Sequence, residues 1–596
     1  MRHPLRHHLR NNLLRAGSWL AGTALICAGA LPAAASATPR ENRVPTSAAP
    51  APRAAADPAY QVLVFSRTAG FRHSSIDDGV TALRELGGAN NFTVDATEDP
   101  TAFTTANLAR YEAVVFLSTT GDVLNGTQQT AFEQYIRAGG GYVGIHAAAD
   151  TEYDWPFYAG LAGALFHSHP HNQTATVEVE DRAHDATAHL GRTWQRYDEW
   201  YNYRTNPRTT AHVLASLDES SYSGGTMSGD HPIAWCKDHE GGRAFYTGGG
   251  HTDESYAEPA FRRHLLGGVR WAAGMTKADC RPETGYASLF DGGGTGGWQQ
   301  AGPGSFSLAD GTLTSQGGLG MLWHADRELT GDYSVKVDWR AEGDDNSGVF
   351  LGFPASSDPW SAVNNGYEIQ IDATDSPDRT TGAVYGFKSA DTVARDAALN
   401  PPGEWNTFEL RVTGERLEIF LNGRKINDFT NTDPARSLRQ GHVGLQNHGE
   451  GDTVAFRNVR VKTSGGTPAP TAGEVKGVNG KCLDVADGAS ADGTQVQLWT
   501  CNGSNAQKWS RPGDGTVRAL GKCLDISGGG SADGTKIQLW TCNGTGAQAW
   551  QPQGDATMRN PQSGKCLDAE GGTWNDGTRV HLWTCHTGPN QKWTLP

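Results

Sequence analysis

The sequence predicts a multidomain chain in which a parallel-sheet α/β domain is followed by two all-β domains. Strand-like and helix-like segments alternate from about residue 60 to residue 275, which is typical of a parallel sheet covered by helices. From residue 285 to residue 463, short segments of alternating hydrophobicity are separated by Gly, Asp and Asn, and this pattern indicates a β-sandwich. The C-terminal part repeats one motif three times, as in folds whose single unit cannot bury its own apolar face.

Length, charge and glycine content agree with this organisation. The 596 residues exceed what one hydrophobic core usually serves. The 76 glycines and 37% hydrophobic residues are typical of loop-rich β structure rather than of a membrane-embedded protein. A formal net charge of −15 argues against a nucleic-acid partner, because a phosphate backbone requires a cationic surface. We also expect no nucleotide cofactor.

Residues 1–37 have the organisation of an export signal. A segment with several arginines precedes the apolar run "AGSWLAGTALICAGAL", and small residues near Ala37 offer a cleavage site. The apolar run is too short to span a bilayer, so we expect a secreted, extracellular protein without membrane insertion after cleavage. The alternative is a protein tethered to the membrane by a lipid on Cys27. The bulky Ile26 that precedes Cys27 disfavours this alternative. Residues 38–58 are rich in Ala and Pro and predict a flexible linker.

The cysteines that remain after the export signal are even in number, which predicts disulfide bonds in an exported chain. Most of them recur with one spacing in the repeats, so each repeat is expected to close one loop. Cys236 and Cys280 remain and are expected to pair with each other. The alternative is that Cys236 is a free nucleophile. The pairs expected in the repeats are Cys482–Cys501, Cys523–Cys542 and Cys566–Cys585.

The three repeats share the elements "GKCLD", "DGT", "LWTC" and Q-x-W. Over residues 474–596 they closely resemble the ricin-B-type β-trefoil lectins, which implies a poly- or oligosaccharide as partner. The resemblance implies that the Asp of "CLD" binds sugar hydroxyls and that the aromatic residue before "TC" stacks on the sugar ring. A sugar has one apolar face and a rim of hydroxyls, so an aromatic ring and a carboxylate are the least that can recognise it. The residues concerned are Asp484, Trp499, Asp525, Trp540, Asp568 and Trp583.

The third repeat has the most complete set of polar residues. Asn590 precedes its Q-x-W residue Gln591, where the first two repeats have Ala506 and Ala547, and His586 follows its second cysteine. We therefore expect the strongest sugar site in the third repeat, with a gain by avidity on a polymer if the other sites also bind. The Q-x-W tryptophans are expected in the core, and a core position is the alternative for the "LWTC" tryptophans.

Residues 285–463 resemble the 3-keto-disaccharide hydrolase family. The motifs that carry the resemblance include "NSGVFLG", "NGYEIQIDA", "PPGEWNTFEL" and "LQNHGEGDTVAFRNVRV". The resemblance implies a jelly-roll, laminin-G-like sandwich that cleaves glycosides oxidised at C3, where the ketone acidifies the neighbouring C2–H. Removal of that proton by a base drives out the anomeric substituent, and water adds afterwards. A short linker, residues 464–473, follows the sandwich.

Glu368, Gln370 and Asp372 alternate along "YEIQID", so we expect them on one face of a strand. Glu368 or Asp372 is the candidate base, or a ligand for a cation such as Ca²⁺. Gln370 completes this polar face. His448 and Arg457 are further catalytic candidates that match the family motifs.

Residues 59–276 resemble the trehalose-utilisation (ThuA-like) branch of the class I glutamine-amidotransferase fold. The motifs include "TAGFRHSSI", "GGGYVGIHAAADT", "FHSHP" and "YTGGGHTDESY". In "GYVGIHAAAD" a buried strand ends at His146, where a nucleophile elbow would expose Ser or Cys on a sharp turn. An imidazole cannot form the thioester of glutamine hydrolysis, so we expect no glutaminase activity.

Histidines at predicted strand ends are candidates for a metal site in this α/β domain. Imidazoles together with a carboxylate suit Zn²⁺, Mn²⁺ or Fe²⁺. They equally suit acid–base work on a sugar ketone at neutral pH. The alternative for His146 is an elbow residue that is hydrogen-bonded into the sheet. The candidate ligands are His73, His146, His167, His169, His251 and Glu199.

All three resemblances concern sugars, and they favour a glycan-anchored, exported protein that cleaves (3-keto-)glycosides by general acid–base chemistry. His146 is a catalytic candidate in addition to the sandwich residues. The number of histidines in the first domain favours the hypothesis that the protein is an enzyme. The alternative is a non-catalytic multi-module glycan-binding protein with an inactive α/β domain. Gly352 favours this alternative, because the family commonly has Arg at the matching position.

Overall fold

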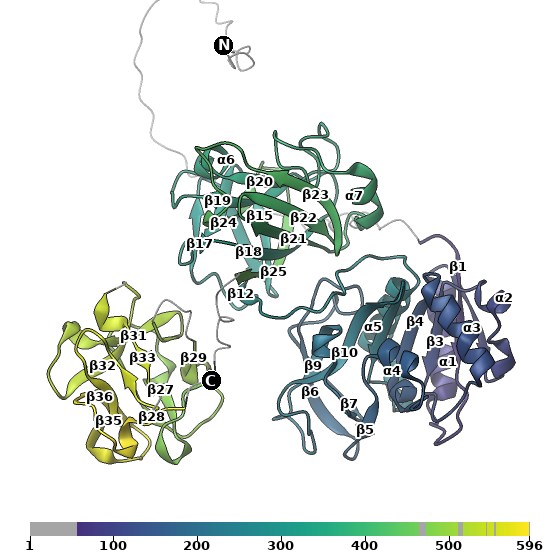
Figure 1. Ribbon diagram of the computed structural model, residues 1–596, viewed down its shortest axis with the longest axis horizontal. Coiled ribbons are helices and arrows are strands. Elements are labelled where there is room, and N and C mark those ends of the chain that lie inside the picture. The colour runs from purple at the N-terminus through teal and green to yellow at the C-terminus, as the bar shows by residue number, and fades with distance from the viewer. Residues whose placement is uncertain (1–56, 464–472, 511–515, 544, 554–555, 595–596) are drawn as a thin grey trace, which may run out of the picture. The chain divides into compact units, whose positions relative to one another are not determined.

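A computed structural model describes residues 57–463, 473–510, 516–543, 545–553 and 556–594, which form three domains (Figure 1). The expected export signal and most of the two predicted linkers, 38–58 and 464–473, lie outside the described residues. Within the described ranges, no helix combines the length and hydrophobicity that a membrane crossing requires.

The N-terminal domain alternates strands and helices, as the sequence predicts. Its strands are β1 (Tyr60–Phe65), β2 (Phe92–Thr97), β3 (Ala113–Leu117), β4 (Gly141–Ile145), β5 (Phe166–Ser168), β6 (Gln173–Val179), β7 (Thr193–Asp198), β8 (Asn202–Tyr203), β9 (His212–Leu217), β10 (His231–His239) and β11 (Gly242–Thr247). Its helices are α1 (Ile76–Ala89), α2 (Thr105–Leu108), α3 (Gly126–Arg137), α4 (Pro156–Ala162) and α5 (Pro259–Ala272).

The main sheet of this domain is mixed, with the order β2-β1-β3-β4-β11-β10-β9-β6-β7. The part from β2 to β11 is parallel, which confirms the predicted parallel α/β fold. The remaining strands extend the sheet by antiparallel pairing. The carboxyl ends of β1, β3, β4 and β11 therefore meet at one edge, which is where α/β sheets bind ligands.

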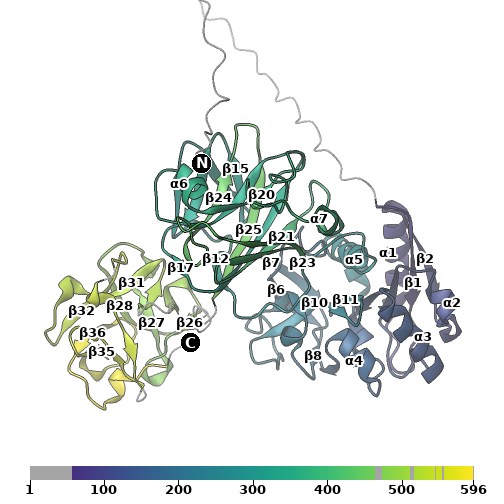
Figure 2. The ribbon, with the colours of Figure 1, turned by 45° about the horizontal axis from the view of Figure 1, so that its top comes forward.

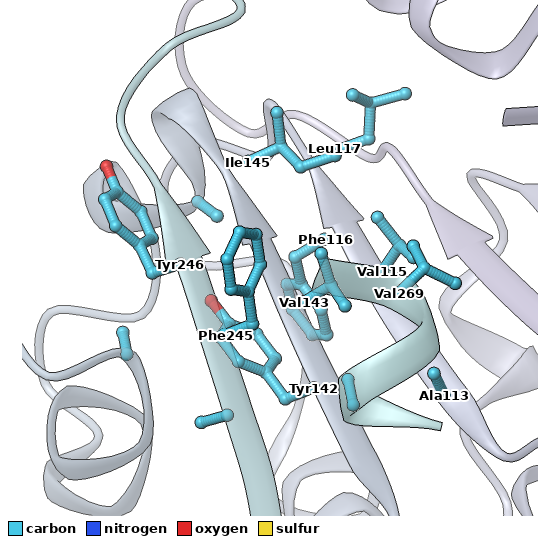
Figure 3. Packing of buried hydrophobic residues seen from close by; sticks show 14 of the residues in the cluster. Ala113, Val115, Phe116, Leu117, Tyr142, Val143, Ile145, Phe245, Tyr246 and Val269 are labelled. Carbon is cyan, nitrogen blue, oxygen red and sulfur yellow. The ribbon is translucent and has the colours of Figure 1, made fainter. Parts of the chain in front are cut away.

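Helices cover both faces of the parallel part of the sheet. Val115 of β3 lies against Val269 of α5 on one face (Figure 3). On the other face, the ring of Phe116 is 5.3 Å from that of Phe132 in α3 and 5.4 Å from that of Tyr158 in α4. Neighbouring residues of a strand point to opposite faces, so a fully apolar strand such as β3 is buried on both sides. This packing fixes the strand ends that carry the functional loops.

The second domain is an antiparallel β-sandwich, again as predicted. Its strands are β12 (Ala287–Phe290), β13 (Trp298–Ala301), β14 (Ser305–Ala309), β15 (Thr312–Gln316), β16 (Gly320–His324), β17 (Leu329–Thr330), β18 (Tyr333–Ala341), β19 (Ser347–Phe353), β20 (Tyr367–Ile371), β21 (Asn406–Thr413), β22 (Arg416–Leu421), β23 (Arg424–Thr430), β24 (Gln440–Asn447) and β25 (Val454–Thr463). Two helices, α6 (Trp360–Asn365) and α7 (Thr392–Ala398), interrupt the strands. One sheet has the order β14-β15-β25-β18-β21-β22-β23, with β12 on β25, and the other has the order β13-β16-β24-β19-β20, with β17 on β24.

Strand β20 separates the core of the sandwich from a polar surface. Tyr367, Ile369 and Ile371 are almost fully buried in the hydrophobic core. Glu368 and Gln370 alternate with them and point to the opposite face of the sheet, as the sequence pattern predicts. Both are also buried, because α6 and the loops beside it cover this face.

The third domain contains one hairpin from each repeat (Figures 1 and 2). Its strands are β26 (Gly473–Glu474), β27 (Cys482–Val485), β28 (Thr494–Trp499), β29 (Lys508–Trp509), β30 (Arg518–Ala519), β31 (Lys522–Ile526), β32 (Thr535–Trp540), β33 (Gln551–Pro552), β34 (Met558–Arg559), β35 (Cys566–Ala569) and β36 (Thr578–Trp583). Strand β28 pairs with both β32 and β36, and these two also pair with each other. The three repeats therefore close on one another as a β-trefoil-like fold.

The Q-x-W tryptophans form the centre of this domain, as expected. Trp509, Trp550 and Trp593 are at most 4% exposed. Each indole N–H donates to the backbone carbonyl of the Leu in the "CLD" element of its own repeat. Burial of the ring together with a satisfied N–H group is what makes a tryptophan stable in a core.

A second recurring contact joins each repeat to the next. Asp576 of the third repeat accepts hydrogen bonds from Thr500 N at 2.6 Å and from Lys481 Nζ at 2.7 Å, both in the first repeat. Asp492 and Asp533 make the equivalent contacts to Thr541 and Thr584 of the following repeats. The "DGT" and "LWTC" elements thus link all three repeats in a closed cycle.

The disulfide bonds join the cysteines that were expected to pair. Cys236 is bonded to Cys280, so Cys236 has no free thiol that could act as a nucleophile. The three repeats contain Cys482–Cys501, Cys523–Cys542 and Cys566–Cys585.

Removal of the disulfide in the α/β domain will destabilise that domain. The bond joins cysteines separated by 44 positions, and a loop of that length corresponds to about 4 kcal/mol of chain entropy in the unfolded state. We expect the Cys236→Ser/Cys280→Ser double variant to lower the unfolding transition of this domain in urea, followed by tryptophan fluorescence. The matched Cys523→Ser/Cys542→Ser variant will move only the transition of the trefoil domain, and equal transitions in all three proteins would contradict the expectation.

Candidate functional site

A pocket of about 250 Å³ lies beside β20 in the sandwich domain. Its polar lining residues come from β20, β24 and the loops beside them, and its apolar lining residues include residues of β19 and α6. The polar residues are Asn346, Glu368, Gln370, Asp375, Tyr385, Gln446 and His448. The apolar residues are Leu319, Phe350, Pro359, Trp360 and Val363. A pocket with both kinds of side chain suits a sugar ring, which has an apolar face and a rim of hydroxyls.

Glu368 lies in this pocket in an environment that disfavours its charge. Burial raises the pKa of Glu368 to about 8, and a hydrogen bond from Gln446 offsets this only in part. Glu368 Oε1, Gln370 Oε1 and Gln446 Oε1 are buried without a hydrogen-bond partner among the described residues. Unpartnered buried acceptors are costly, so a pocket that holds three of them is prepared for a ligand with several hydroxyl groups.

Asp372 has a different role from Glu368, although the two share one strand face. Its carboxylate accepts hydrogen bonds from Asn346 Nδ2 at 2.6 Å and from the backbone N–H of Thr374 at 2.8 Å. Asn346 Oδ1 in turn accepts a hydrogen bond from Gln370 Nε2 at 3.1 Å. Asp372 is therefore satisfied by the protein and holds Asn346 and Gln370 in position.

The other sandwich candidates are divided between this pocket and the opposite sheet. His448 lines the pocket, and its Nδ1 atom is 2.8 Å from Asp452 Oδ2. Arg457 lies on β25 of the other sheet, where its Nε donates to Thr312 Oγ1 at 2.7 Å and its guanidinium stacks 4.3 Å from the ring of Trp405. The structure thus brings His448 together with Glu368 and Gln370 but leaves Arg457 away from them.

Gly352, the departure from the family pattern, occupies a position that cannot hold a side chain. Its φ is +73°, and a Cβ atom there would lie 2.3 Å from Ser437 O. The absence of Arg therefore follows from a close approach of two backbone segments at a bulge of β19.

The N-terminal domain brings four candidate ligands together at the carboxyl edge of its sheet. His73 follows β1, His146 follows β4, Glu199 follows β7 and His251 follows β11. One ligand atom from each residue lies within 4.8 Å of the others. This set is named the histidine cluster here. Side chains from four separate strand ends converge, although they are far apart in the sequence.

The orientation of His146 is determined by the backbone and by a hydrogen bond. His146 has a φ of +49° and is fully buried, so the chain makes the sharp turn of an elbow at this residue. Its Nδ1 atom lies 3.0 Å from Gly248 O, which makes Nδ1 the protonated nitrogen and leaves the Nε2 lone pair for the cluster. His146 Nε2 is 3.2 Å from His251 Nδ1 and 3.5 Å from Glu199 Oε2.

The cluster shifts the pKa values of its members in different directions. Burial and the neighbouring imidazoles of His146 and His251 lower the pKa of His73 to about 3. Burial lowers the pKa of His251, but a hydrogen bond to Glu199 outweighs it and raises that pKa overall. Burial opposes ionisation of Glu199, but its contacts with the His146 and His251 side chains outweigh burial and hold the pKa of Glu199 well below its usual range. His73 Nδ1 is buried without a hydrogen-bond partner among the described residues. A buried cluster of this composition could hold a transition-metal ion.

A second carboxylate supports the loop that carries His251. Asp198 is fully buried and accepts hydrogen bonds from the backbone N–H groups of Gly250 and His251, at 2.8 Å and 3.0 Å. It also accepts one from Arg196 at 2.9 Å. The position of His251 is therefore set by protein contacts alone.

Residues next to the cluster were only partly foreseen from the sequence. His169 Nδ1 lies 2.9 Å from Glu199 Oε1, whereas His167 is exposed and lies outside the cluster, with its Nδ1 3.1 Å from Ser168 Oγ. The ring of Tyr201 is 4.4 Å from that of His146. Asp150 ends the short helix that begins at His146, and burial raises the pKa of its carboxyl group.

Each trefoil repeat places its "CLD" aspartate beside its "LWTC" tryptophan. In the first repeat Asp484 pairs in register with Gln497, two residues before Trp499 on the same strand. The carboxylate accepts hydrogen bonds from Gln497 and from the Q-x-W residue Gln507, both at 3.0 Å. Trp499, Trp540 and Trp583 are 38–39% exposed, unlike the Q-x-W tryptophans. The second repeat repeats this geometry at Asp525.

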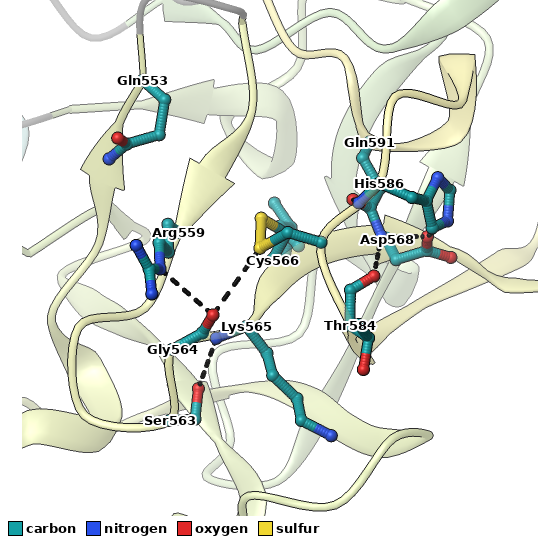
Figure 4. Close-up of a disulfide and its surroundings, with 12 residues drawn as sticks. Gln553, Arg559, Ser563, Gly564, Lys565, Cys566, Asp568, Thr584, His586 and Gln591 are labelled. Carbon is teal, nitrogen blue, oxygen red and sulfur yellow. Dashed lines mark hydrogen bonds and ion pairs between the residues drawn. A yellow bond between two sulfur atoms is a disulfide. The ribbon is translucent and has the colours of Figure 1, made fainter.

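The third repeat has additional polar groups around its aspartate (Figure 4). Asp568 accepts hydrogen bonds from Asn590 Nδ2 and Gln591 Nε2, both at 2.8 Å. His581 Nε2 lies 3.0 Å and His586 Nε2 3.4 Å from the same carboxylate. The indole ring of Trp583 stacks on His581 at 5.1 Å. His581 was not foreseen as a site residue, although its position matches Gln497 in the repeat alignment.

Comparison with known families identifies all three domains. Residues 61–272 match the ThuA (trehalose utilisation) family, residues 285–462 match the 3-keto-alpha-glucoside-1,2-lyase-like domain, and residues 471–593 match the ricin-type beta-trefoil lectin domain. The protein is thus a multidomain, carbohydrate-related protein. It consists of a ThuA domain, a 3-keto-disaccharide hydrolase-like domain and a carbohydrate-binding ricin-B lectin domain, in that order.

Individual relatives cover only parts of the chain. The chain is 54% identical over 58 residues to a glucan endo-1,3-beta-glucosidase of Cellulosimicrobium cellulans, which is 10% of each protein. It spans about a tenth of the length of the curated relatives it matches.

Two solved structures resemble single parts of the chain. A structure from Bacteroides uniformis, provisionally described as a ThuA-like protein, is 27% identical and covers 38% of this chain and 95% of its own, with a TM-score of 0.33. A structure from Parabacteroides distasonis, provisionally described as a glycosyl hydrolase, is 21% identical and covers 30% of this chain and 94% of its own, with a TM-score of 0.26.

The raised pKa of Glu368 predicts a pH-dependent stability of the sandwich. Between the ordinary glutamate value of 4.5 and about 8, the unfolded chain has lost this proton while the folded chain keeps it. The free energy of unfolding therefore falls as pH rises through this window, by at most about 1.4 kcal/mol per pH unit. We expect Glu368→Gln to remove this dependence, so urea unfolding will show the variant gaining stability over the wild type from about pH 5 to pH 8. The exposed Glu328→Gln serves as control, and parallel pH profiles of wild type and Glu368→Gln would contradict the assignment.

The extra polar groups of the third repeat predict unequal sugar sites. We expect Asp568→Asn to weaken retention on immobilised mono- and polysaccharides by about tenfold or more, because a charge-assisted hydrogen bond to a sugar hydroxyl is lost. The same change at Asp484 should have a smaller effect on retention, because the first repeat has Ala506 at the position that corresponds to Asn590. Equal losses for Asp484→Asn and Asp568→Asn would show that the third site has no advantage.

Proposed function

We propose that this is an exported, glycan-anchored enzyme whose sandwich domain cleaves glycosides oxidised at C3 by elimination. The supporting observation is Glu368, a buried carboxyl group with an unpartnered oxygen in a pocket of sugar size. The match of residues 285–462 to the 3-keto-alpha-glucoside-1,2-lyase-like domain supports the same chemistry. Burial that raises the pKa of a carboxylate also makes it a stronger base for a weakly acidic C–H group.

The reaction that fits the pocket begins with proton transfer from C2 of the sugar to Glu368. The C2–H electron pair forms a double bond between C1 and C2, and the C1–O bond breaks with its electron pair on the leaving oxygen. His448, held by Asp452, gives a proton to that oxygen. Tyr385 lines the pocket, and in this reaction its hydroxyl group donates a hydrogen bond to the C3 ketone, where negative charge develops.

The substrate is held by polar and apolar side chains of the pocket. Gln370 Oε1 and Gln446 Oε1 have no other hydrogen-bond partner in the described structure and accept hydrogen bonds from sugar hydroxyls. Trp360 is half exposed at the rim of the pocket and stacks on the apolar face of the ring. This arrangement presents C2–H to the carboxylate of Glu368.

The two flanking domains extend this function. We propose that the trefoil domain retains the enzyme on a poly- or oligosaccharide through Asp568 and Trp583. The disulfide bonds support export, because such bonds persist in oxidising compartments. We also propose that the histidine cluster binds one divalent transition metal, held by His73, His146, Glu199 and His251. The imidazole-rich ligand set suits Zn²⁺, Mn²⁺ or Fe²⁺ rather than Ca²⁺.

The elimination chemistry predicts a dependence on Glu368 and on pH. With the 4-nitrophenyl 3-keto-glucoside as substrate, we expect Glu368→Gln to lower the rate of aglycone release about a hundredfold or more, since the base is lost. The wild-type rate should rise with pH up to about 8, where Glu368 becomes ionised. The unoxidised glucoside should not be cleaved, because its C2–H is not acidic.

Glu328→Gln is the matched control for this assay and should behave as the wild type. Absence of aglycone release from the oxidised glucoside, with glycan binding intact, would refute the proposal. That result would favour a non-catalytic, multi-module glycan-binding protein.

A further inference from the structure

The histidine cluster has an accessible side, which a purely structural metal site would lack. His146 and Glu199 form its buried floor, whereas the side chain of His251 is 23% exposed and that of His169 is 43% exposed. Phe71 next to His73 is 68% exposed, with its ring 4.9 Å from the imidazole. Structural metal sites are closed by protein ligands, and catalytic sites keep a position open for water or substrate.

The surrounding fold does not depend on a metal to hold the cluster. Asp198 fixes the loop before His251 through backbone hydrogen bonds, and Gly248 O fixes the ring of His146. The left-handed backbone of His146 is a strained conformation for a residue with a side chain, and strain of this kind concentrates at functional sites. The fold therefore maintains this geometry independently of a structural ion.

The elimination proposed for the sandwich leaves a product that requires a second reaction. Breaking the C1–O bond produces a sugar with a C1=C2 double bond conjugated to the C3 ketone. C1 of such an enone is electrophilic and accepts water. A complete hydrolysis of the glycoside therefore consists of an elimination followed by a hydration, and the latter needs an activated water and a proton carrier.

We propose that the histidine cluster is a second catalytic centre, which adds water across the C1=C2 bond of the enone that the sandwich domain releases. This inference rests on the elimination and the metal site proposed above. A divalent metal held by the cluster would supply a water that is more acidic than bulk water. The product is the free 3-keto sugar.

The hydration conserves all atoms and needs no redox partner. The water oxygen bonds to C1, the electron pair of the double bond moves toward C2 and the conjugated ketone, and one proton of the water is transferred to C2. Asp150 is the carboxyl group that can carry this proton, because it ends the short helix that begins at His146 and receives a hydrogen bond from the Tyr153 hydroxyl group. The ketone has the same oxidation state before and after the step.

The aromatic residues around the cluster fit a flat, conjugated ring. Tyr201 packs against His146 at 4.4 Å and against Phe166 at 4.3 Å, and His169 lies 6.0 Å from the same tyrosine ring. Tyr201 is only 3% exposed and supports these side chains from behind, so the exposed rings of Phe71 and His169 are the faces on which a planar enone can stack. The imidazole and carboxylate groups lie beside these faces.

The test supplies the purified enone directly to the full-length protein and follows its hydration by proton NMR. Metal content is measured in parallel by mass spectrometry after loading with Zn²⁺, Mn²⁺ or Fe²⁺ and desalting. We expect the wild type to bind about one metal ion per chain and to hydrate the enone. His146→Asn should lose the metal and slow hydration about a hundredfold. Asn tolerates the left-handed backbone at this position, and Glu199→Gln is a second variant that leaves the elbow unchanged.

The exposed His171→Asn is the matched control and should keep both metal and hydration activity. The inference is overturned if the loaded wild type retains no metal, if the enone persists with the wild type, or if both cluster variants hydrate it at the wild-type rate. Failure of the proposed glycosidic elimination is a separate outcome. It is seen as absent aglycone release from the 3-keto-glucoside, whereas the supplied enone bypasses that step.

Discussion

A buried polar atom without a hydrogen-bond partner costs free energy, and both candidate sites hold such atoms next to groups that could bind a ligand. In the sandwich, Glu368, Gln370 and Gln446 each keep an unpartnered oxygen around one pocket. In the α/β domain, His73 keeps an unpartnered nitrogen at the histidine cluster. A ligand that supplied the missing partners would recover this free energy, so both places are prepared for binding.

Two carboxylates close to these sites are hydrogen-bonded by protein groups and have supporting roles. Asp372 shares a strand face with Glu368 but accepts hydrogen bonds from Asn346 and from a turn. Asp198 is buried near the histidine cluster but is occupied by backbone N–H groups and Arg196. Their hydrogen bonds differ from those of Glu368, which keeps one buried carboxylate oxygen without a partner among the described residues.

In the proposed function, the three domains address different parts of one chemical problem. An aromatic ring and a carboxylate on the trefoil surface suit a hydrated glycan, because water remains at such an interface and binding stays reversible. A desolvated carboxylate in the sandwich pocket suits removal of a weakly acidic proton. An imidazole-rich cluster suits activation of water. The disulfides and the cyclic contacts of the repeats hold the most exposed of these sites together.

The sequence by itself determined the features that depend on local pattern. Alternation along "YEIQID" placed Glu368 and Gln370 on the side opposite the core. The regular spacing of the cysteines and the repeats placed the disulfides, the buried Q-x-W tryptophans and the exposed tryptophans. The strand that ends at His146 indicated the elbow.

Only the tertiary structure decided which distant residues meet. It brought His73, His146, Glu199 and His251 to one edge while leaving His167 outside, and it placed Arg457 on the sheet opposite Glu368. It also placed Trp360 at the pocket, although the segment that contains Trp360 has no hydrophobic periodicity that would predict this position. The order of strands in a sheet and the paths of loops follow from non-local pairing and packing, and single-sequence patterns carry no record of either.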